Sequence, residues 1–90
     1  MHVLEEKTSR YREFLERAIK DVKIVAPHPL QDVANDYLTM AKSYCQDGVH
    51  FQEKGDMVNA LACFSYGHAW LDAGARLGVF DVKDKTLFAI

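Results

Sequence analysis

Two histidine–carboxylate pairs are the residues of this chain whose types and spacing could do chemistry. His68 precedes Asp72 by four residues. Asp47 precedes His50 by three, so the members of each pair would share one face of a helix. Two such pairs could hold a metal ion. In a helical hairpin, however, the Asp47/His50 pair falls beside residues 61–64, one or two turns short of His68. The sequence also has no HExxH motif, and we therefore predict no metal site and no cofactor.

The two cysteines are the candidates for nucleophilic chemistry. Cys45 and Cys63 could approach each other across the same hairpin, but they form no CxxC pair. Cys63 has no His and acid at the spacing of a catalytic triad. A single cysteine on an apolar helix face is usually a small buried hydrophobe. We therefore predict no catalytic residue and no enzymatic activity.

Aromatic residues lie on the same segment as His68. Tyr66 and Trp70 are four residues apart, and such aromatics often anchor interfaces. Two interpretations stay open: they complete the core with their polar atoms at its edge, or they belong to a polar binding edge. The candidate binding residues are Tyr66, His68, Trp70, Asp72 and His50. Arg76 follows Asp72 by four residues, and we expect the two to form an ion pair.

Composition and charge narrow the class of protein. Ninety residues form one domain, which we take as residues 1–90. The net charge of −2 gives no basic excess for holding nucleic acid phosphates, so we expect no DNA partner. The first residues are too charged for a signal peptide, and no run of about 18 apolar residues could span a bilayer. We therefore expect a cytoplasmic protein with reduced thiols and no membrane association.

Hydrophobic periodicity predicts three helices. The first covers about 3–25, the second about 30–54 and the third about 57–77. The segment 26–29, Ala-Pro-His-Pro, predicts a short extended linker, because each Pro lacks an N–H and disfavours helix in the residue before it. Gly48 costs about 1 kcal/mol relative to Ala inside a helix. We therefore expect close helix contact or a bend at that position.

The second and third helices are joined by a very short turn. Gly55 suits a left-handed helix end and Asp56 suits the N-cap of the next helix. A turn this short predicts an antiparallel hairpin. The remaining segment, 79–90, is an apolar tail that either packs over an end of the bundle, as we expect, or binds a partner. The predicted fold class is all-α, a three-helix up-down-up bundle built on a long hairpin of the second and third helices.

The hairpin resembles the archaeal family known as domain of unknown function 357. The resemblance covers residues 47–78 strongly and the first helix only in its general pattern. The matching residues are Asp47, His50, Phe51, Gly55, Asp56, Asn59, Ala60, Leu61, Ala62, Tyr66, Gly67, Trp70, Leu71, Asp72, Ala73, Gly74 and Gly78. The resemblance implies a compact three-helix bundle from an archaeal cytoplasm, and it implies no activity.

The pattern of the third helix gives the leading functional hypothesis. That helix is apolar on two faces, and only two other helices can cover it. We therefore expect a non-enzymatic interaction or structural module that self-associates as a homo-oligomer. The alternative is a small-molecule-binding or RNA-processing accessory domain that uses the polar edge of the second and third helices. A deep pocket lined by His50, Tyr66, His68 and Asp72 would favour that alternative, and their placement on separate faces would exclude it.

Overall fold

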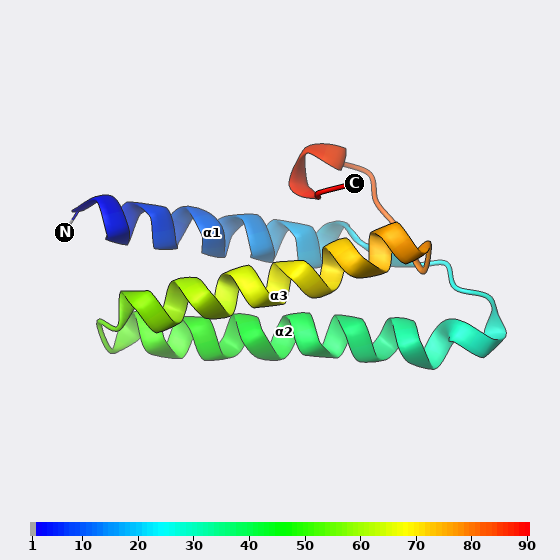
Figure 1. Cartoon of the computed structure of the whole chain (residues 1–90), viewed down its shortest axis with the longest axis horizontal. Coiled ribbons are helices and arrows are strands. Elements are labelled where there is room, and N and C mark those ends of the chain that lie inside the picture. The colour runs from blue at the N-terminus through cyan, green and yellow to red at the C-terminus, as the bar shows by residue number, and fades with distance from the viewer. Residues whose placement is uncertain (1) are drawn as a thin grey trace.

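Three long helices lie side by side in the computed structural model, which describes residues 2–90 (Figure 1). They are α1 (His2–Asp21), α2 (Gln31–Glu53) and α3 (Met57–Leu77). The chain runs up along α1, down along α2 and up again along α3, in a body measuring 45 × 23 × 15 Å. The predicted all-α, up-down-up bundle is confirmed.

The hairpin of α2 and α3 begins and ends where the sequence predicts. Gly55 has φ +80°, in the left-handed region that Gly adopts without steric cost. Asp56 is the N-cap of α3, and its Oδ1 accepts a hydrogen bond from the Asn59 N–H at 3.2 Å. Gly78 closes α3 with φ +91°. The cap residues therefore determine both ends of α3.

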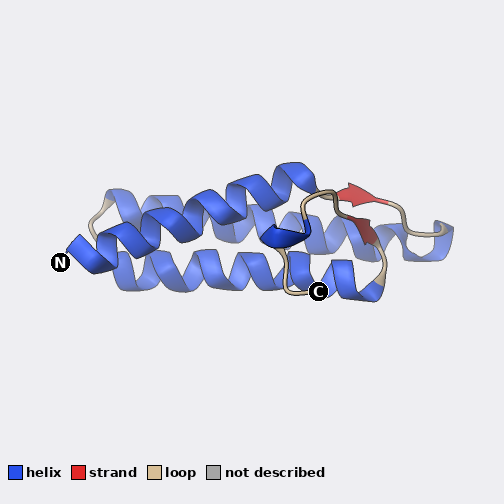
Figure 2. Ribbon diagram, turned by 90° about the horizontal axis from the view of Figure 1, so that it is seen from above, coloured by secondary structure: helices blue, strands red, loops and turns tan. Residues whose placement is uncertain are grey.

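The first helix ends earlier than the sequence pattern predicts. Helix α1 stops at Asp21, and strand β1 (Lys23–Ile24) pairs antiparallel with strand β2 (Phe80–Asp81) (Figure 2). The Val25 N–H also donates to the Val79 carbonyl at 3.0 Å. The prediction of helix up to residue 25 was wrong because β-branched residues at 22–25 find strand partners that lie more than fifty residues away.

The linker between α1 and α2 is extended only in part. Pro27 has φ −61° and ψ 157°, as predicted for extended chain. The next residues form a short 3-10 helix, η1 (His28–Leu30), which leads directly into α2. Proline suits the first positions of a helix because an N–H there would have no partner within the helix, so its absence costs nothing. This explains Pro29 within η1.

The core lies along the inner side of α3. Leu15, Phe64 and Leu71 are fully buried. A Cβ at Gly48 would stand 2.4 Å from the Phe64 ring, so the expected close helix contact at this glycine is present. The second apolar face predicted for α3, on which Ala60 and Gly67 lie, is buried as well. The exposed side of α3 is a third face.

The tail after β2 packs on the chain's own helices. It contains a second 3-10 helix, η2 (Lys85–Leu87), followed by extended residues. Leu87 and Phe88 are only 5% and 8% exposed. Figure 1 shows this segment, coloured orange to red, leaving the end of α3 and turning back beside the second half of α1. The tail therefore forms part of the bundle's surface layer.

Candidate functional site

His68 and Asp72 come together on the side of α3 that faces the tail. Their Nε2 and Oδ1 atoms are 3.8 Å apart. The His68 Nε2 is hydrogen-bonded to the Leu87 carbonyl, and Asp72 Oδ1 accepts the Ala89 N–H at 3.0 Å. Because a carbonyl oxygen only accepts, Nε2 is the donor in this contact. Both side chains therefore bind the main chain of the tail.

Arg76 makes the third contact of this kind. Its guanidinium donates to the Ala89 carbonyl at 3.0 Å. The predicted ion pair of Arg76 with Asp72 was wrong, because both side chains turn to the same tail residue. We call His68, Asp72 and Arg76 the tail ladder, since they follow one another at intervals of four residues along one side of α3. That spacing was visible in the sequence, but nothing there identified the tail as the partner.

A hollow of about 430 Å³ opens beside the tail ladder, between α1, α3 and the tail. We call it the tail groove. Phe14 and Tyr11 of α1 form one wall and remain 38% and 36% exposed. The full lining is Tyr11, Phe14, Phe64, Ser65, His68, Asp72, Thr86, Leu87, Phe88 and Ala89. Sequence reasoning identified only His68 and Asp72 in this set, because the other walls come from elements whose relative placement the sequence does not give.

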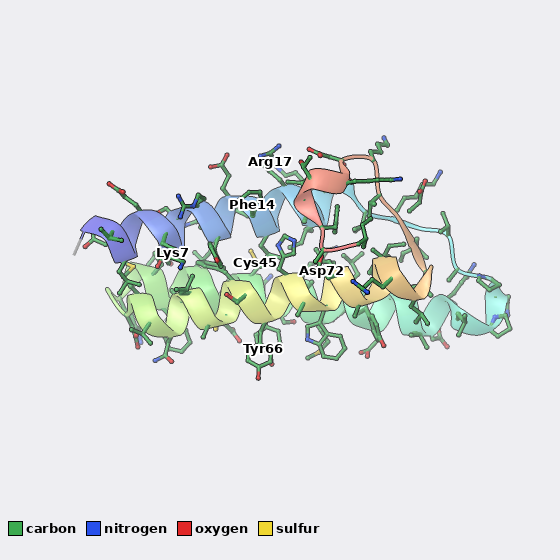
Figure 3. All side chains as sticks on the ribbon, turned by 45° about the horizontal axis from the view of Figure 1, so that its top comes forward. Lys7, Phe14, Arg17, Cys45, Tyr66 and Asp72 are labelled. Carbon is green, nitrogen blue, oxygen red and sulfur yellow. The ribbon has the colours of Figure 1, made fainter. Side chains whose placement is uncertain are left out.

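Tyr66 and Trp70 lie on a different side of α3. Tyr66 is 63% exposed and stacks on Tyr44 with ring centroids 5.5 Å apart. Trp70 is half-buried and meets the Tyr37 ring edge-on at 5.1 Å. Figure 3 shows Tyr66 projecting away from α1, whereas Asp72 lies beside the tail. Trp70 therefore lies at the edge of the core, which was the first of the two interpretations, whereas Tyr66 is a surface residue.

A second, smaller hollow lies between these aromatic rings. It measures about 270 Å³ and is lined by Tyr44, Tyr66, Ala69, Trp70 and Ala73. We call it the aromatic hollow. His50 lines neither hollow: it is exposed on α2, next to the Phe51 ring at 6.2 Å between centroids. The five predicted binding residues therefore divide into three places, and no hollow is lined by more than two of them.

The outward face of α3 is a continuous apolar stripe. Its large members Val58, Tyr66 and Leu77 are 69%, 63% and 54% exposed. The small residues between them are exposed as well, and none of the six is charged. We call this set the α3 stripe: Val58, Ala62, Tyr66, Ala69, Ala73 and Leu77. At a rise of about 1.5 Å per residue, it extends for roughly 28 Å along the helix.

The two thiols are in environments that suppress their reactivity. Burial, with a smaller effect of the nearby Glu16 carboxylate, raises the pKa of the Cys45 thiol. Burial and the Asp47 carboxylate raise the pKa of the Cys63 thiol. Because the thiolate is the nucleophile, both groups are poor nucleophiles near neutral pH. Within residues 2–90, His, Cys, Asp and Glu side chains form no cluster of three or more with the geometry of a metal site.

The fold and these surfaces define a class of protein: a small three-helix bundle with a docked tail and one uncovered helix face. Residues 10–80 match the family model described as "Protein of unknown function (DUF357)", and the chain belongs to this family. The crystal structure of protein AF1782 from Archaeoglobus fulgidus, assigned to the same family model, is similar in fold, with a TM-score of 0.75 at 24% identity. The alignment covers 91% of this chain and 96% of that one. A search of curated proteins finds no match.

The sequence resemblance to this family is therefore confirmed by the family model. The solved relative is archaeal, and its fold agrees with the three-helix bundle described above. None of the helices in residues 2–90 has a stretch long and apolar enough to cross a membrane.

Proposed function

We propose that this chain is a non-enzymatic interaction module that self-associates through the α3 stripe. The observation that carries the proposal is an exposed helix face with six uncharged residues in a row along its axis. Exposed apolar patches of this extent mark interaction sites more often than bare surface. The proposal places the protein in the cytoplasm, where its two free thiols stay reduced, and assigns it a protein partner rather than DNA.

The spacing of the stripe supports a second copy as the partner. Its intervals are four, four, three, four and four residues, a series that reads the same in both directions. Two such helices packed antiparallel about a two-fold axis would therefore bring each member opposite another member. Val58 would face Leu77 of the other copy, and Ala62 would face Ala73. Tyr66 would face Ala69, a large residue against a small one.

The aromatic hollow supports this arrangement. It lies beside Ala69 and Ala73, where the Tyr66 side chain of a second copy would arrive. The small residues let the two helix backbones approach closely, and the tyrosine ring would enter the space left between Tyr44 and Trp70. Aromatic residues such as tyrosine are enriched at interface centres.

Charged residues in place of Ala62 and Ala73 test both the association and the antiparallel arrangement of the two α3 helices. Ala62→Glu with Ala73→Glu would set like charges against each other across the two-fold axis, whereas Ala62→Glu with Ala73→Lys would set opposite charges there. Sedimentation over a concentration series should show a dimer for the wild type and for the Glu/Lys variant, and a monomer for the Glu/Glu variant. A wild type that remains monomeric throughout, or two variants that behave alike, would overturn the proposal.

A further inference from the structure

The tail is bound by side chains of α1 and α3 through its main-chain atoms. The tail ladder holds the Leu87 carbonyl and both main-chain polar groups of Ala89. At the other end of the tail, Asp21 Oδ2 accepts the N–H groups of Lys83 at 2.8 Å and of Asp84 at 3.2 Å. Contacts of this kind recognise the backbone of the tail and are indifferent to the side chains it carries.

Two consecutive apolar side chains of the tail are buried against the helices. Leu87 and Phe88 are buried at 5% and 8% exposure, and the Phe88 ring lies 6.0 Å from that of His68. Beside them the tail groove keeps about 430 Å³ of open space walled by Tyr11 and Phe14. The tail therefore lies against α1 and α3 as a peptide ligand would, and the tail groove stays open beside it.

We propose that the surface of α1 and α3 that holds the tail is an exchangeable peptide-binding site, and that it takes the segment 84–90 of a second copy in place of its own. The same segment reproduces the hydrogen bonds of Asp84, Leu87 and Ala89 and both apolar contacts, because only the connection to the rest of the chain differs. Exchange of an identical element between copies is a low-cost route to association for this reason. The proposal does not depend on the α3 stripe, since the tail ladder lies on another side of α3.

A synthetic peptide provides the first test. The probe is the acetylated, amidated, fluorescently labelled peptide of residues 84–90, and the protein is the full chain with Leu87→Asp and Phe88→Asp, which releases its own tail. Ala69→Glu is added throughout to remove association through the α3 stripe. Anisotropy should show saturable binding that is at least about tenfold tighter than to the chain with an intact tail, which competes at high effective concentration. No saturable binding, or equal binding to both chains, would overturn the site.

A mixing experiment tests the second copy as the source of the peptide. One chain carries Leu87→Asp with Phe88→Asp and so has a groove without a functional tail. The other carries His68→Ala with Asp72→Ala and so has a tail without a functional groove. Each alone should be monomeric in the Ala69→Glu background, and the mixture should form a 1:1 complex in sedimentation. A mixture as monomeric as its components would overturn the exchange between copies.

Hydrogen exchange on the wild type keeps the proposal testable if these variants fail to fold. Release of the tail requires a local opening that leaves the helices intact. The Ala89 amide, which is bound to Asp72, should therefore exchange much faster than the amides around Leu71 in the core of α3. Equal protection at the two places would mean that the tail leaves only on global unfolding, and the proposal would be wrong.

Discussion

Two sides of the same helix have opposite properties. On one side of α3, His68, Asp72 and Arg76 carry polar groups, and all three are engaged by the tail. On the outward side, the α3 stripe is apolar and uncovered from Val58 to Leu77. The side that carries the histidine–carboxylate pair is thus occupied by the tail, and the apolar side is the one open to a partner.

The difference follows from what each kind of surface requires. The Leu87 carbonyl is partly withdrawn from water when Leu87 and Phe88 pack down, and main-chain groups that lose water need hydrogen-bond partners. The tail ladder supplies them. A stripe of Val, Ala, Tyr and Leu has little such need, and its free energy falls only when another apolar surface covers it. Histidine and aspartate side chains on a helix are therefore weak evidence for a ligand where a tail of the same chain lies within reach.

The largest difference in stability is expected between a substitution in the core of α3 and one on the α3 stripe. Phe64 is fully buried beneath the tail groove, so Phe64→Ala should lower the free energy of unfolding by about 3–5 kcal/mol. Leu77→Ala on the α3 stripe should cost under about 0.5 kcal/mol in dilute solution, as surface substitutions do. Urea titration measures both. Similar costs for the two variants would mean that the stripe is buried in the folded protein.

Loss of a tail ladder group should have a smaller and local effect. Asp72→Ala removes the acceptor of the Ala89 N–H and should destabilise the protein by about 1 kcal/mol. Hydrogen exchange should show the protection of Ala89 lost while the amides of α3 stay protected. Asp72→Asn keeps one acceptor oxygen and should retain more of that protection. An Ala89 amide that exchanges equally in all three proteins would contradict the role given to Asp72.

Tyr66 should matter more for association than for folding. Tyr66→Ala removes the stacking on Tyr44 and should cost at most about 1 kcal/mol in dilute solution. At high protein concentration the wild type should gain thermal stability by mass action, and the variant should not. Tyr66→Phe keeps the ring and serves as the control. A wild-type melting temperature that does not depend on protein concentration would contradict association through the α3 stripe.

The smallest effect is expected at Asp84. Hydrogen bonds from the Thr86 hydroxyl and then the Thr86 N–H lower the pKa of the Asp84 carboxyl. Because the pKa is lower in the folded state, the Asp84 carboxylate stabilises the fold at pH values above its pKa in the unfolded chain, about 3.9. That contribution is lost as the pH falls through the folded value. Asp84→Asn should therefore be slightly less stable than the wild type at neutral pH, with the difference shrinking on acidification.

Thermal unfolding over a pH series measures this difference. Asp36→Asn, on the exposed surface of α2, changes the net charge equally and serves as the control. An Asp84→Asn difference that grew toward acidic pH would have the wrong sign and would contradict the assignment of the Thr86 hydrogen bonds.

The binding residues could be predicted from the sequence only in part. His68 and Asp72 were expected to be neighbours and are, because four residues on a helix return to the same side. Placing Tyr66 and Trp70 with them was a weaker inference, since positions two residues apart on a helix point in different directions. Tyr11, Phe14 and the tail were not identified, because the walls of the tail groove come from segments more than fifty residues apart. The binding role of Tyr66, His68, Trp70, Asp72 and His50 stays a prediction.

Local sequence determined where the helices of this protein lie. Gly55, Asp56 and Gly78 fix the ends of α3 through backbone geometry and capping that need no distant partner. Only the tertiary structure decided what happens at residues 22–25 and 79–90. There a strand pair joins segments that are remote in the chain, and side chains of α3 bind the tail's main chain. Helical hydrogen bonds join residues four apart, so sequence predicts them well, whereas contacts between distant segments depend on where the packed helices bring them.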